Sequence, residues 1–195
     1  MEKTIINLAK AYVGECQARN RYTFYSKIAK KEGFEQIADI FLQTAEQEKE
    51  HAKWLFRLIN NLKKEGNSDV FEELKIEAEV PIIYKDTISN LKAAALGEHY
   101  ENTTMYPEFA KIADEEGLSD IAKRLRSIAI AEKHHEQRYL KLLKEVENNS
   151  VFKKADKIYW VCRKCGYVCE GLEPVEECPS CNHPKNYFER QCEEY

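Results

Sequence analysis

Two segments of the chain repeat one another, and both carry acidic residues and a histidine at matching positions. The first copy begins at Gly14 and the second at Gly97, and a Gly-Glu pair opens each at an offset of 83 residues. The offset is 84 for the later matches, which are Tyr22 with Tyr106, 27–29 with 111–113, 32–33 with 116–117, 37–38 with 121–122, Glu48 with Glu132 and His51 with His135. Self-similarity of this kind predicts two copies of one supersecondary unit.

Each copy has the pattern of two helices joined by a glycine turn. Apolar residues recur at spacings of three and four, which is the helical period, and Gly33 and Gly117 each follow charged residues, as helix-terminating glycines do. We therefore expect helices near 3–32, 34–64, 87–116 and 118–147. Residues 65–86 are too many for a tight turn and suit a crossover along a four-helix bundle.

Seven ionisable residues interrupt the apolar stripes of the four helices. Glu15 lies 18 residues before the turn at Gly33 and Glu48 lies 15 after it, so their levels differ by only about 5 Å at about 1.5 Å per residue. The second copy gives the same result, and the seven should converge near the middle of the bundle. They are Glu15, Glu48, His51, Glu98, Glu101, Glu132 and His135.

Five buried glutamates would repel one another unless a cation lies among them. Glu-x-x-His places both side chains on one helix face, and carboxylate with imidazole suits iron or manganese. One glutamate from each of two helices and Glu-x-x-His from each of the other two is the ligand set of ferritin-like di-iron proteins. The alternatives are a buried hydrogen-bond network and glutamates that lie on the surface. Here the set is Glu15, Glu98, Glu48-x-x-His51 and Glu132-x-x-His135.

The two copies differ in two respects near this site. Glu101 has no counterpart in the first copy, where Ala18 stands, so one side has an extra carboxylate. The offset also changes by one residue between Glu98 and Tyr106, and an extra residue inside a helix is usually absorbed as a π-bulge. We predict a distorted helix between Glu101 and Pro107.

Tyr22 and Tyr106 are equivalent in the repeat and lie about two turns from Glu15 and Glu98. Their hydroxyls could bond to a ligand carboxylate, as an orienting group or proton donor. The alternative is that both are ordinary core tyrosines.

The last part of the chain has a different composition, because six of the seven cysteines lie between Cys162 and Cys192. Two Cys-x-x-Cys pairs separated by 12 residues predict a tetrahedral four-thiolate metal site formed by Cys162, Cys165, Cys178 and Cys181. Zinc would make this tail a structural ribbon and iron a one-electron carrier. Its place beside a redox-capable site favours iron, and Cys169 and Cys192 are surplus.

The formal net charge of −4 and the absence of a basic run argue against nucleic acid as a partner. Apolar runs are far shorter than the roughly 20 residues of a membrane span, and the first residues lack a secretory signal pattern. We expect a cytoplasmic protein that does not bind membranes.

With both metal motifs in view, the chain closely resembles the rubrerythrin family along nearly its whole length. The resemblance implies a mainly α protein with a ferritin-like four-helix bundle over 1–148, a linker over 149–157 and a rubredoxin-like domain over 158–195. It also implies three iron ions per chain, one di-iron centre and one iron bound by four cysteines.

The same resemblance implies a peroxidase that reduces hydrogen peroxide to water and protects air-sensitive cells. Glu48 and Glu132 would bridge the irons, Glu15 would bind one iron, and Glu98 with His135 would bind the other. His51 and Glu101 would exchange on the first iron with its oxidation state, since a ferric ion prefers the anionic ligand.

Electrons would reach the di-iron site through the four-cysteine iron, between the subunits of a head-to-tail homodimer. No G-x-G-x-x-G fingerprint is present, so an NAD(P)H-dependent reductase or a rubredoxin-type carrier would supply them. Two other functions compete with this one. One is a ferroxidase, iron-storage or oxygen-reducing protein, and the other is a non-catalytic binding module with a zinc ribbon.

Overall fold

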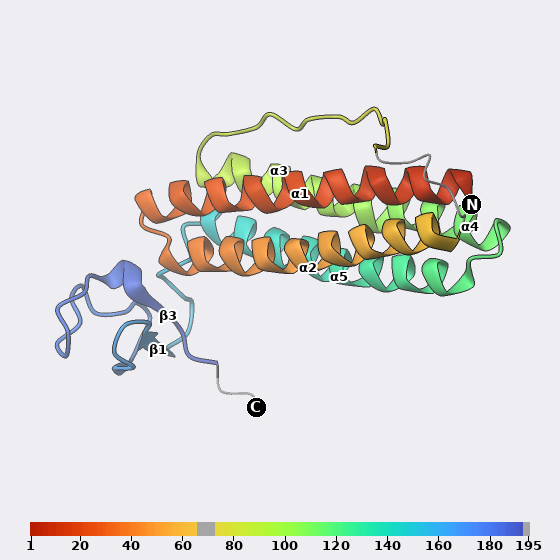
Figure 1. Cartoon of the computed structure of the whole chain (residues 1–195). Coiled ribbons are helices and arrows are strands. Elements are labelled where there is room, and N and C mark those ends of the chain that lie inside the picture. The colour runs from red at the N-terminus through yellow and green to blue at the C-terminus, as the bar shows by residue number, and fades with distance from the viewer. Residues whose placement is uncertain (66–72, 193–195) are drawn as a thin grey trace.

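Long antiparallel helical rods lie side by side, with a small tail at one end of them (Figure 1). The computed structural model describes residues 1–65 and 73–192. The first hairpin is α1 (Glu2–Lys31) and α2 (Glu35–Glu65). The second has α3 (Thr87–Tyr100), a π-helix η1 (Glu101–Met105) and α4 (Tyr106–Glu115) in one rod, followed by α5 (Ser119–Glu147). The predicted bundle is confirmed, and each rod begins and ends within one residue of the expected position.

The two predicted glycine turns end the first helix of each hairpin. Gly33 has φ +83° and Gly117 has φ +76°, a left-handed conformation that side chains with a Cβ rarely adopt. The next residue then donates its N–H back into the helix, Phe34 to the carbonyl of Ala29 and Leu118 to that of Ala113, both at 2.8 Å. This is the Schellman arrangement, and it reverses the chain within three residues.

Each hairpin also caps the first helix of the other. Glu116, beside the turn of the second hairpin, accepts from the backbone N–H of Lys3 at 3.2 Å and of Thr4 at 2.9 Å. Glu32, its counterpart in the repeat, accepts from the N–H of Thr87 at 3.0 Å. Burial opposes the charged form of Glu116, but the amino terminus and these N–H groups lower its pKa to about 2. The repeat thus stabilises helix N-termini reciprocally.

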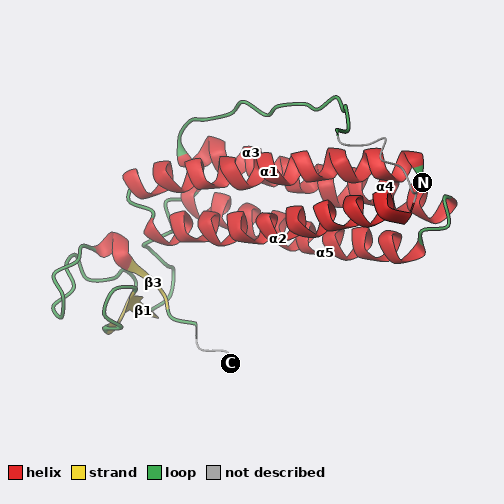
Figure 2. Ribbon diagram, in the orientation of Figure 1, coloured by secondary structure: helices red, strands yellow, loops and turns green. Residues whose placement is uncertain are grey.

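The connection between the hairpins runs lengthwise along the outside of the bundle over residues 73–86 (Figure 2). It ends at Asp86, whose side chain accepts from the N–H of Ser89 at 2.7 Å and so caps α3. This confirms the crossover for the described part of the predicted connection. Residues 66–72, which the prediction also included, lie outside the described residues.

The interior of the bundle has two apolar cores separated by a polar layer. One core, nearer the tail, packs aromatic residues such as Tyr22, Phe41 and Tyr139. The other, at the opposite end, is mostly aliphatic and includes Leu8, Leu55 and Leu125, with Tyr106 among them. The buried glutamates lie between the two cores. Among the described helices, none is both long and apolar enough to cross a membrane.

The tail is a three-stranded antiparallel sheet in the order β2-β1-β3, with β1 (Ile158–Cys162), β2 (Val168–Gly171) and β3 (Phe188–Arg190). A 3₁₀ turn η2 (Lys185–Tyr187) precedes β3. Trp160 and Phe188 are buried in its small core with Cys162 and Cys178. A metal is expected to stabilise so small a core.

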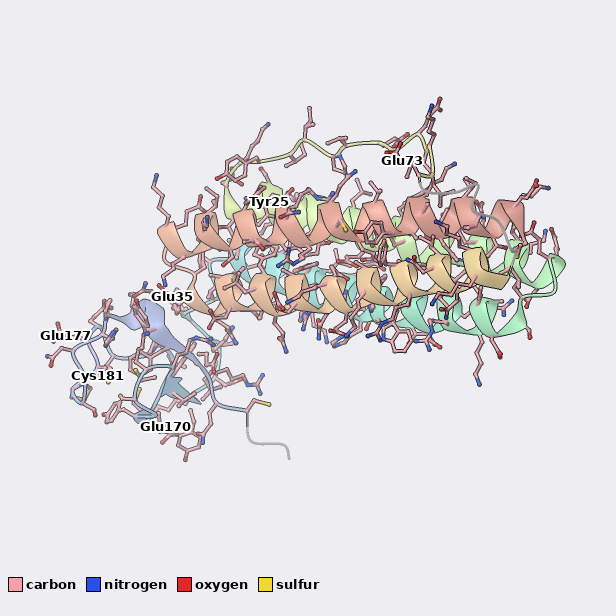
Figure 3. The ribbon with its side chains drawn as sticks, in the orientation of Figure 1. Tyr25, Glu35, Glu73, Glu170, Glu177 and Cys181 are labelled. Carbon is pink, nitrogen blue, oxygen red and sulfur yellow. The ribbon has the colours of Figure 1, made fainter. Side chains whose placement is uncertain are left out.

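The tail contacts the end of its own bundle, at the end where Glu35 begins α2 (Figure 3). Arg163 forms ion pairs with Asp39 of α2 and with Glu189 of the tail. Between the two parts of the chain, Phe152 stacks on Phe34 with ring centroids 6.4 Å apart. These contacts hold the tail at the bundle end, away from the polar layer.

Candidate metal centres

The polar layer brings together six of the seven residues predicted to bind the di-metal pair. They form two groups, each with ligand atoms within 4.8 Å of one another. The groups share two glutamates, one from α2 and one from α5. The first group is Glu15, Glu48, His51 and Glu132, and the second is Glu48, Glu98, Glu132 and His135.

The two shared glutamates each turn one oxygen toward each histidine. Glu48 places Oε2 3.0 Å from Nδ1 of His51 and Oε1 3.1 Å from Nδ1 of His135. Glu132 places Oε1 2.9 Å from Nδ1 of His51 and Oε2 2.8 Å from Nδ1 of His135. Glu15 completes the His51 side and Glu98 the His135 side, at 3.8 Å and 3.5 Å from the same nitrogens. This arrangement has the symmetry of two metal positions joined by two bridging carboxylates.

The donor atoms of this layer fit a pair of metal ions. Ligands about 2.1 Å from a metal and at right angles to one another lie about 3.0 Å apart, close to the spacings between the histidines and the shared glutamates. Several of the buried atoms have no hydrogen-bond partner within the described residues, although they lie close together. They are Oε2 of Glu15, Oε1 of Glu48, Oε2 of Glu98, both oxygens of Glu132 and Nδ1 of His135.

The electrostatics of the layer also indicate a missing positive charge. Burial opposes the charged form of Glu48, but the imidazoles of His135 and His51 lower its pKa to about 2. Burial would lower the pKa of both histidines, but the carboxylates of Glu132 and Glu48 raise it to about 10 for His51 and about 12 for His135. Without a metal, protons on the two histidines therefore take its place.

The remaining carboxyls are driven toward the neutral form. Burial, and then the charge of Glu48, raises the pKa of Glu98 to about 8. Burial raises the pKa of Glu15 and Glu101 well above the usual range, with neighbouring carboxylates adding to it. Such a cluster is unfavourable in a protein core unless a cation binds it.

Glu101 is the one predicted ligand that lies outside both groups. It is buried to 9% exposure and lines a cavity of about 320 Å³ between α1, the α3–η1 junction and the segment 77–81. Arg21 of α1 lines the same cavity, and its charge favours the ionised form of Glu101. In this structure the imidazole of His51 therefore contacts the two shared glutamates, Glu48 and Glu132, whereas the side chain of Glu101 lines the neighbouring cavity.

The predicted distortion of the third rod is confirmed by η1. The N–H of Tyr106 donates to the carbonyl of Glu101, five residues earlier, which is the π-helical pattern. Side chains also donate to backbone carbonyls in this stretch. Asn102 donates to the carbonyl of Glu98 at 2.7 Å and Thr103 to that of His99 at 2.6 Å. Because the π-helix absorbs the extra residue, Glu98 and Tyr106 both stay on the inner face.

Both predicted tyrosines donate their hydroxyls to glutamates of the layer. Tyr22 donates to Oε1 of Glu98 at 2.5 Å, and Tyr106 donates to Oε1 of Glu15. Each bond crosses from one hairpin to the other, so each tyrosine orients a glutamate of the opposite copy. Both tyrosines have no exposed surface.

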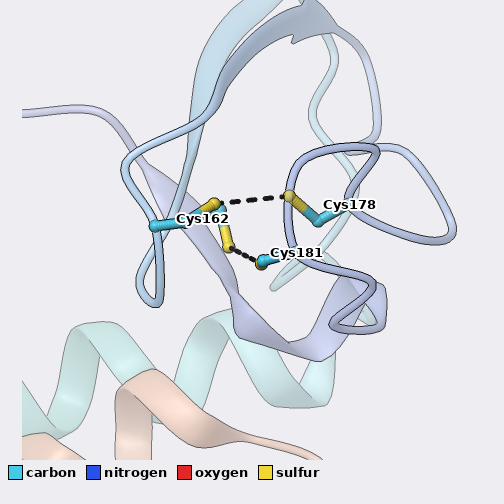
Figure 4. Close-up of side chains that lie close together, drawn as sticks. Cys162, Cys178 and Cys181 are labelled. Atoms are coloured by element: carbon cyan, nitrogen blue, oxygen red, sulfur yellow. Dashed lines mark hydrogen bonds between the residues drawn. The ribbon is translucent and has the colours of Figure 1, made fainter.

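The four predicted cysteines of the tail converge from two loops (Figure 4). Sγ of Cys162 lies 3.7 Å from Sγ of Cys181, and Sγ of Cys165 lies 3.6 Å from Sγ of Cys178. A tetrahedron with metal–sulfur bonds of about 2.3 Å has edges of about 3.8 Å, so the thiols are placed as metal ligands rather than as disulfides. Cys169 lies outside this group, and all seven cysteines are free thiols.

The structure adds two residues that the sequence did not single out. Arg21 lies at the cavity beside Glu101, and no repeat or motif marks it. Tyr139 lies four residues after His135 on the apolar stripe, so its sequence signal is that of a core residue. Its ring packs against Tyr22 with centroids 5.4 Å apart, and its buried hydroxyl has no hydrogen-bond partner in the part of the chain that the structure describes.

Known proteins match the chain over both parts. A family model described as Rubrerythrin matches residues 7–143, and one described as Rubrerythrin, rubredoxin-like domain matches residues 160–189. A putative rubrerythrin of Methanocaldococcus jannaschii is 61% identical over 100% of this chain and 96% of its own length. A rubrerythrin of Nitratidesulfovibrio vulgaris is 48% identical over 96% of this chain and 93% of its own.

Solved structures agree with the sequence matches. A structure titled as the fully reduced, all-ferrous state of nigerythrin is 32% identical to the chain. It covers 96% of this chain and 86% of its own, with a TM-score of 0.62.

Proposed function

The chain belongs to the rubrerythrin family, and we propose that it is a peroxidase that reduces hydrogen peroxide to two molecules of water. It has the di-iron site of that family and a rubredoxin-like four-cysteine site. The observation that carries the proposal is the presence of both sites in one chain. Storage or oxidation of iron needs no returning electrons, whereas repeated reduction of peroxide needs two for each turnover.

The proposed ligands follow the two groups of the polar layer. Glu48 and Glu132 would hold both ions, Glu15 with His51 would hold one of them, and Glu98 with His135 would hold the other. The bridging role is supported by the way both shared glutamates turn one oxygen to each histidine. When bound, the di-iron pair supplies two electrons to the O–O bond, and the four-cysteine iron renews them.

The protein's own groups supply protons and exclude water. Tyr22 can pass a proton through Glu98, and Tyr106 through Glu15, to the oxygen atoms that form when the O–O bond of peroxide breaks. Burial of these groups keeps other water out and strengthens each charge in the layer. Proton supply and the exclusion of water together favour cleavage of the O–O bond to give water over release of hydroxyl radical.

Glu101 and His51 are proposed to take turns as ligands of the first ion. Glu101 stands at a cavity large enough for its carboxylate to move, beside the positive charge of Arg21. A ferric ion favours the anionic Glu101 and a ferrous ion accepts the neutral imidazole of His51. The same cavity is the proposed entry route for peroxide.

Electron supply is proposed to come from an NAD(P)H-dependent reductase or a rubredoxin-type carrier. Within one chain, Arg163 contacts Asp39, which lies nine residues before Glu48, about 14 Å along the axis of α2. This contact places the tail at the bundle end of its own chain, and transfer from the tail of one subunit to the bundle of another in a head-to-tail homodimer is the proposed route. Size in solution and mixing of two inactive variants would test that arrangement.

The test of the function is rapid mixing of the fully reduced protein with one equivalent of hydrogen peroxide, with oxygen as the control. Colour of the thiolate-bound iron reports the tail, and fast return of colour with peroxide but slow return with oxygen is expected. Preference for oxygen would instead indicate an oxidase or ferroxidase, and a colourless protein would indicate zinc in the tail.

A matched pair of variants separates the two metal sites. Cys162→Ser should abolish sustained peroxide turnover, because the tail loses a ligand, while Cys169→Ser should not. In a ferroxidase, Cys162→Ser would leave iron oxidation intact.

A further inference from the structure

The two tyrosines that bond to the metal layer are equivalent in the repeat but have different surroundings. Tyr22 donates to Glu98 and Tyr106 donates to Glu15, and both are fully buried. Orienting a ligand requires only these hydroxyls. A difference in what surrounds the two rings therefore points to a role that only one of them has.

Tyr22 belongs to an aromatic cluster. Its ring lies 5.4 Å from Tyr139, 6.1 Å from Phe41 and 6.3 Å from Tyr25, measured between centroids. Phe41 in turn lies 5.2 Å from Tyr139 and 5.6 Å from Tyr25. The aromatic cluster is defined by these four residues, Tyr22, Tyr25, Phe41 and Tyr139.

Tyr106 lies instead in a mostly aliphatic core, with Tyr12 and Phe109 at its margin. It lies in the core that contains Leu8, Leu125 and Ile128. Among the described residues, no aromatic pair includes its ring. Aliphatic side chains are not oxidised by a neighbouring phenoxyl radical, so Tyr106 lacks the chain of paired rings that Tyr22 has.

The aromatic cluster leads from the metal layer to the surface. Tyr25, labelled on α1 in Figure 3, donates its hydroxyl to the carbonyl of Ile83 at 2.7 Å. Ile83 lies in the segment 73–86 outside the bundle and is 40% exposed. The next residue, Tyr84, is 60% exposed and packs on Phe24 at 6.4 Å. A route thus runs from Glu98 through Tyr22 to Tyr25, which is itself 1% exposed and lies directly under the outer segment 73–86.

We propose that Tyr22 is a one-electron donor that traps hydroxyl radical at the metal site, and that the aromatic cluster carries the oxidising equivalent out to Tyr25. This role rests on the proposed peroxidase function. Peroxide that receives two electrons and two protons gives two waters. Peroxide that receives one electron and one proton gives one water and one hydroxyl radical, as when only one iron of the pair is ferrous.

Tyr22 then supplies the second electron and the second proton. Its O–H bond breaks, its electron reduces hydroxyl radical to hydroxide, and its proton passes along the 2.5 Å bond to Glu98. The hydroxide takes up that proton, so the sum is tyrosine and hydroxyl radical giving tyrosyl radical and water. Tyr22 is restored by an electron and a proton from Tyr25. Tyr25, which is 1% exposed, is reduced in turn by an electron from a thiol at the surface of the segment 73–86, and the thiol's proton passes to the Tyr25 oxygen.

The test uses the iron-loaded full chain brought to the half-reduced state, mixed with peroxide and frozen for EPR. An organic radical signal is expected, and its narrowing in protein made with ring-deuterated tyrosine would assign it to tyrosine. Tyr22→Phe and Tyr106→Phe are matched, because each removes one hydroxyl from one ligand glutamate. Loss of the signal in Tyr22→Phe but not in Tyr106→Phe is expected.

A second variant covers the case in which Tyr22→Phe does not fold. Tyr25→Phe lies outside the metal layer and should leave peroxide reduction by the fully reduced protein unchanged. Its radical should persist on the buried Tyr22 and resist a water-soluble thiol that quenches the parent signal. Mass spectrometry should likewise find oxidation at Tyr25 in the parent only.

The outcomes separate this role from the function on which it rests. Oxygen preference in the fully reduced protein would refute the peroxidase function. Rapid reduction of peroxide with no tyrosyl radical in the half-reduced protein would refute the role of Tyr22 alone. Equal loss of signal in both tyrosine variants would show that the aromatic cluster has no part in it.

Discussion

Glu98 should destabilise the metal-free protein and stabilise the metal-loaded one, and Glu98→Gln should reverse both effects. The carboxyl is fully buried, and its pKa is raised from 4.5 to about 8. A raised carboxyl pKa means that the folded state holds a proton that the unfolded state releases. The penalty is therefore absent below pH 4.5, grows as pH rises, and levels off above pH 8.

The magnitude follows from the same linkage. Holding Glu98 neutral from pH 4.5 up to pH 7 costs about 1.4 kcal/mol per pH unit, or about 3 kcal/mol in total. Glutamine avoids this penalty and still accepts the hydroxyl of Tyr22, but its amide N–H groups must be placed among the carboxylates, at about 1 kcal/mol. We expect the metal-free variant to be more stable by about 2 kcal/mol at pH 7 and by little at pH 5.

The assay is urea unfolding of the chelated protein, followed by far-ultraviolet circular dichroism at pH 5, 6, 7 and 8. Glu108→Gln, at an exposed position of α4, controls for the change in net charge. With iron bound, Glu98→Gln should be less stable than the parent, because an anionic ligand is lost. A metal-free Glu98→Gln variant that is no more stable than the parent at pH 7 would refute the conclusion that the buried carboxyl of Glu98 destabilises the metal-free protein.

Three further outcomes are expected. Cys165→Ser should lose the metal of the tail and unfold it, seen as a shift in tryptophan fluorescence and fast proteolysis after residue 150, whereas Cys169→Ser should do neither. Glu116→Gln should lower stability by about 1 kcal/mol at neutral pH, and because the folded pKa is about 2, that difference should vanish as pH falls from 4.5 toward 2. Deleting Thr103 should convert η1 to α-helix and give Glu98 and Tyr106 the seven-residue spacing of Glu15 and Tyr22, so Tyr106 should still face Glu15 and the iron stoichiometry by metal analysis should match that of a Thr103→Ala control.

Much of the fold could be predicted because its signals are local. A glycine after charged residues can end a helix independently of its tertiary contacts, because the left-handed backbone conformation of Gly33 and Gly117 terminates the helix by itself. The one-residue change of offset predicts the π-helix, because an extra residue must be absorbed for Glu98 and Tyr106 to share a face. Both metal motifs are read in the same way, since ligands three residues apart on a helix or in a knuckle are neighbours by geometry.

The position of an individual side chain is harder to predict when it depends on packing against other helices. Seven ligands at one level could be expected, but not that His51 stands with the shared glutamates while Glu101 stands beside the cavity with Arg21. That choice depends on side-chain rotamers and on space left by the segment 77–81, neither of which has a period in the sequence.

The sequence by itself determined the helices, their turns, the π-helix and the two ligand sets, because each follows from spacing along one element. Only the tertiary structure decided which oxygen of Glu48 and Glu132 faces which histidine, and that Glu32 and Glu116 cap each other's hairpins. It also decided that the ring of Tyr22 packs in an aromatic cluster, whereas the ring of Tyr106 forms no aromatic pair among the described residues. Contacts such as Glu32 with Thr87, Glu48 with His135 and Tyr22 with Tyr139 join residues 55 to 117 positions apart in the chain, and packing of whole faces, not local spacing, selects them.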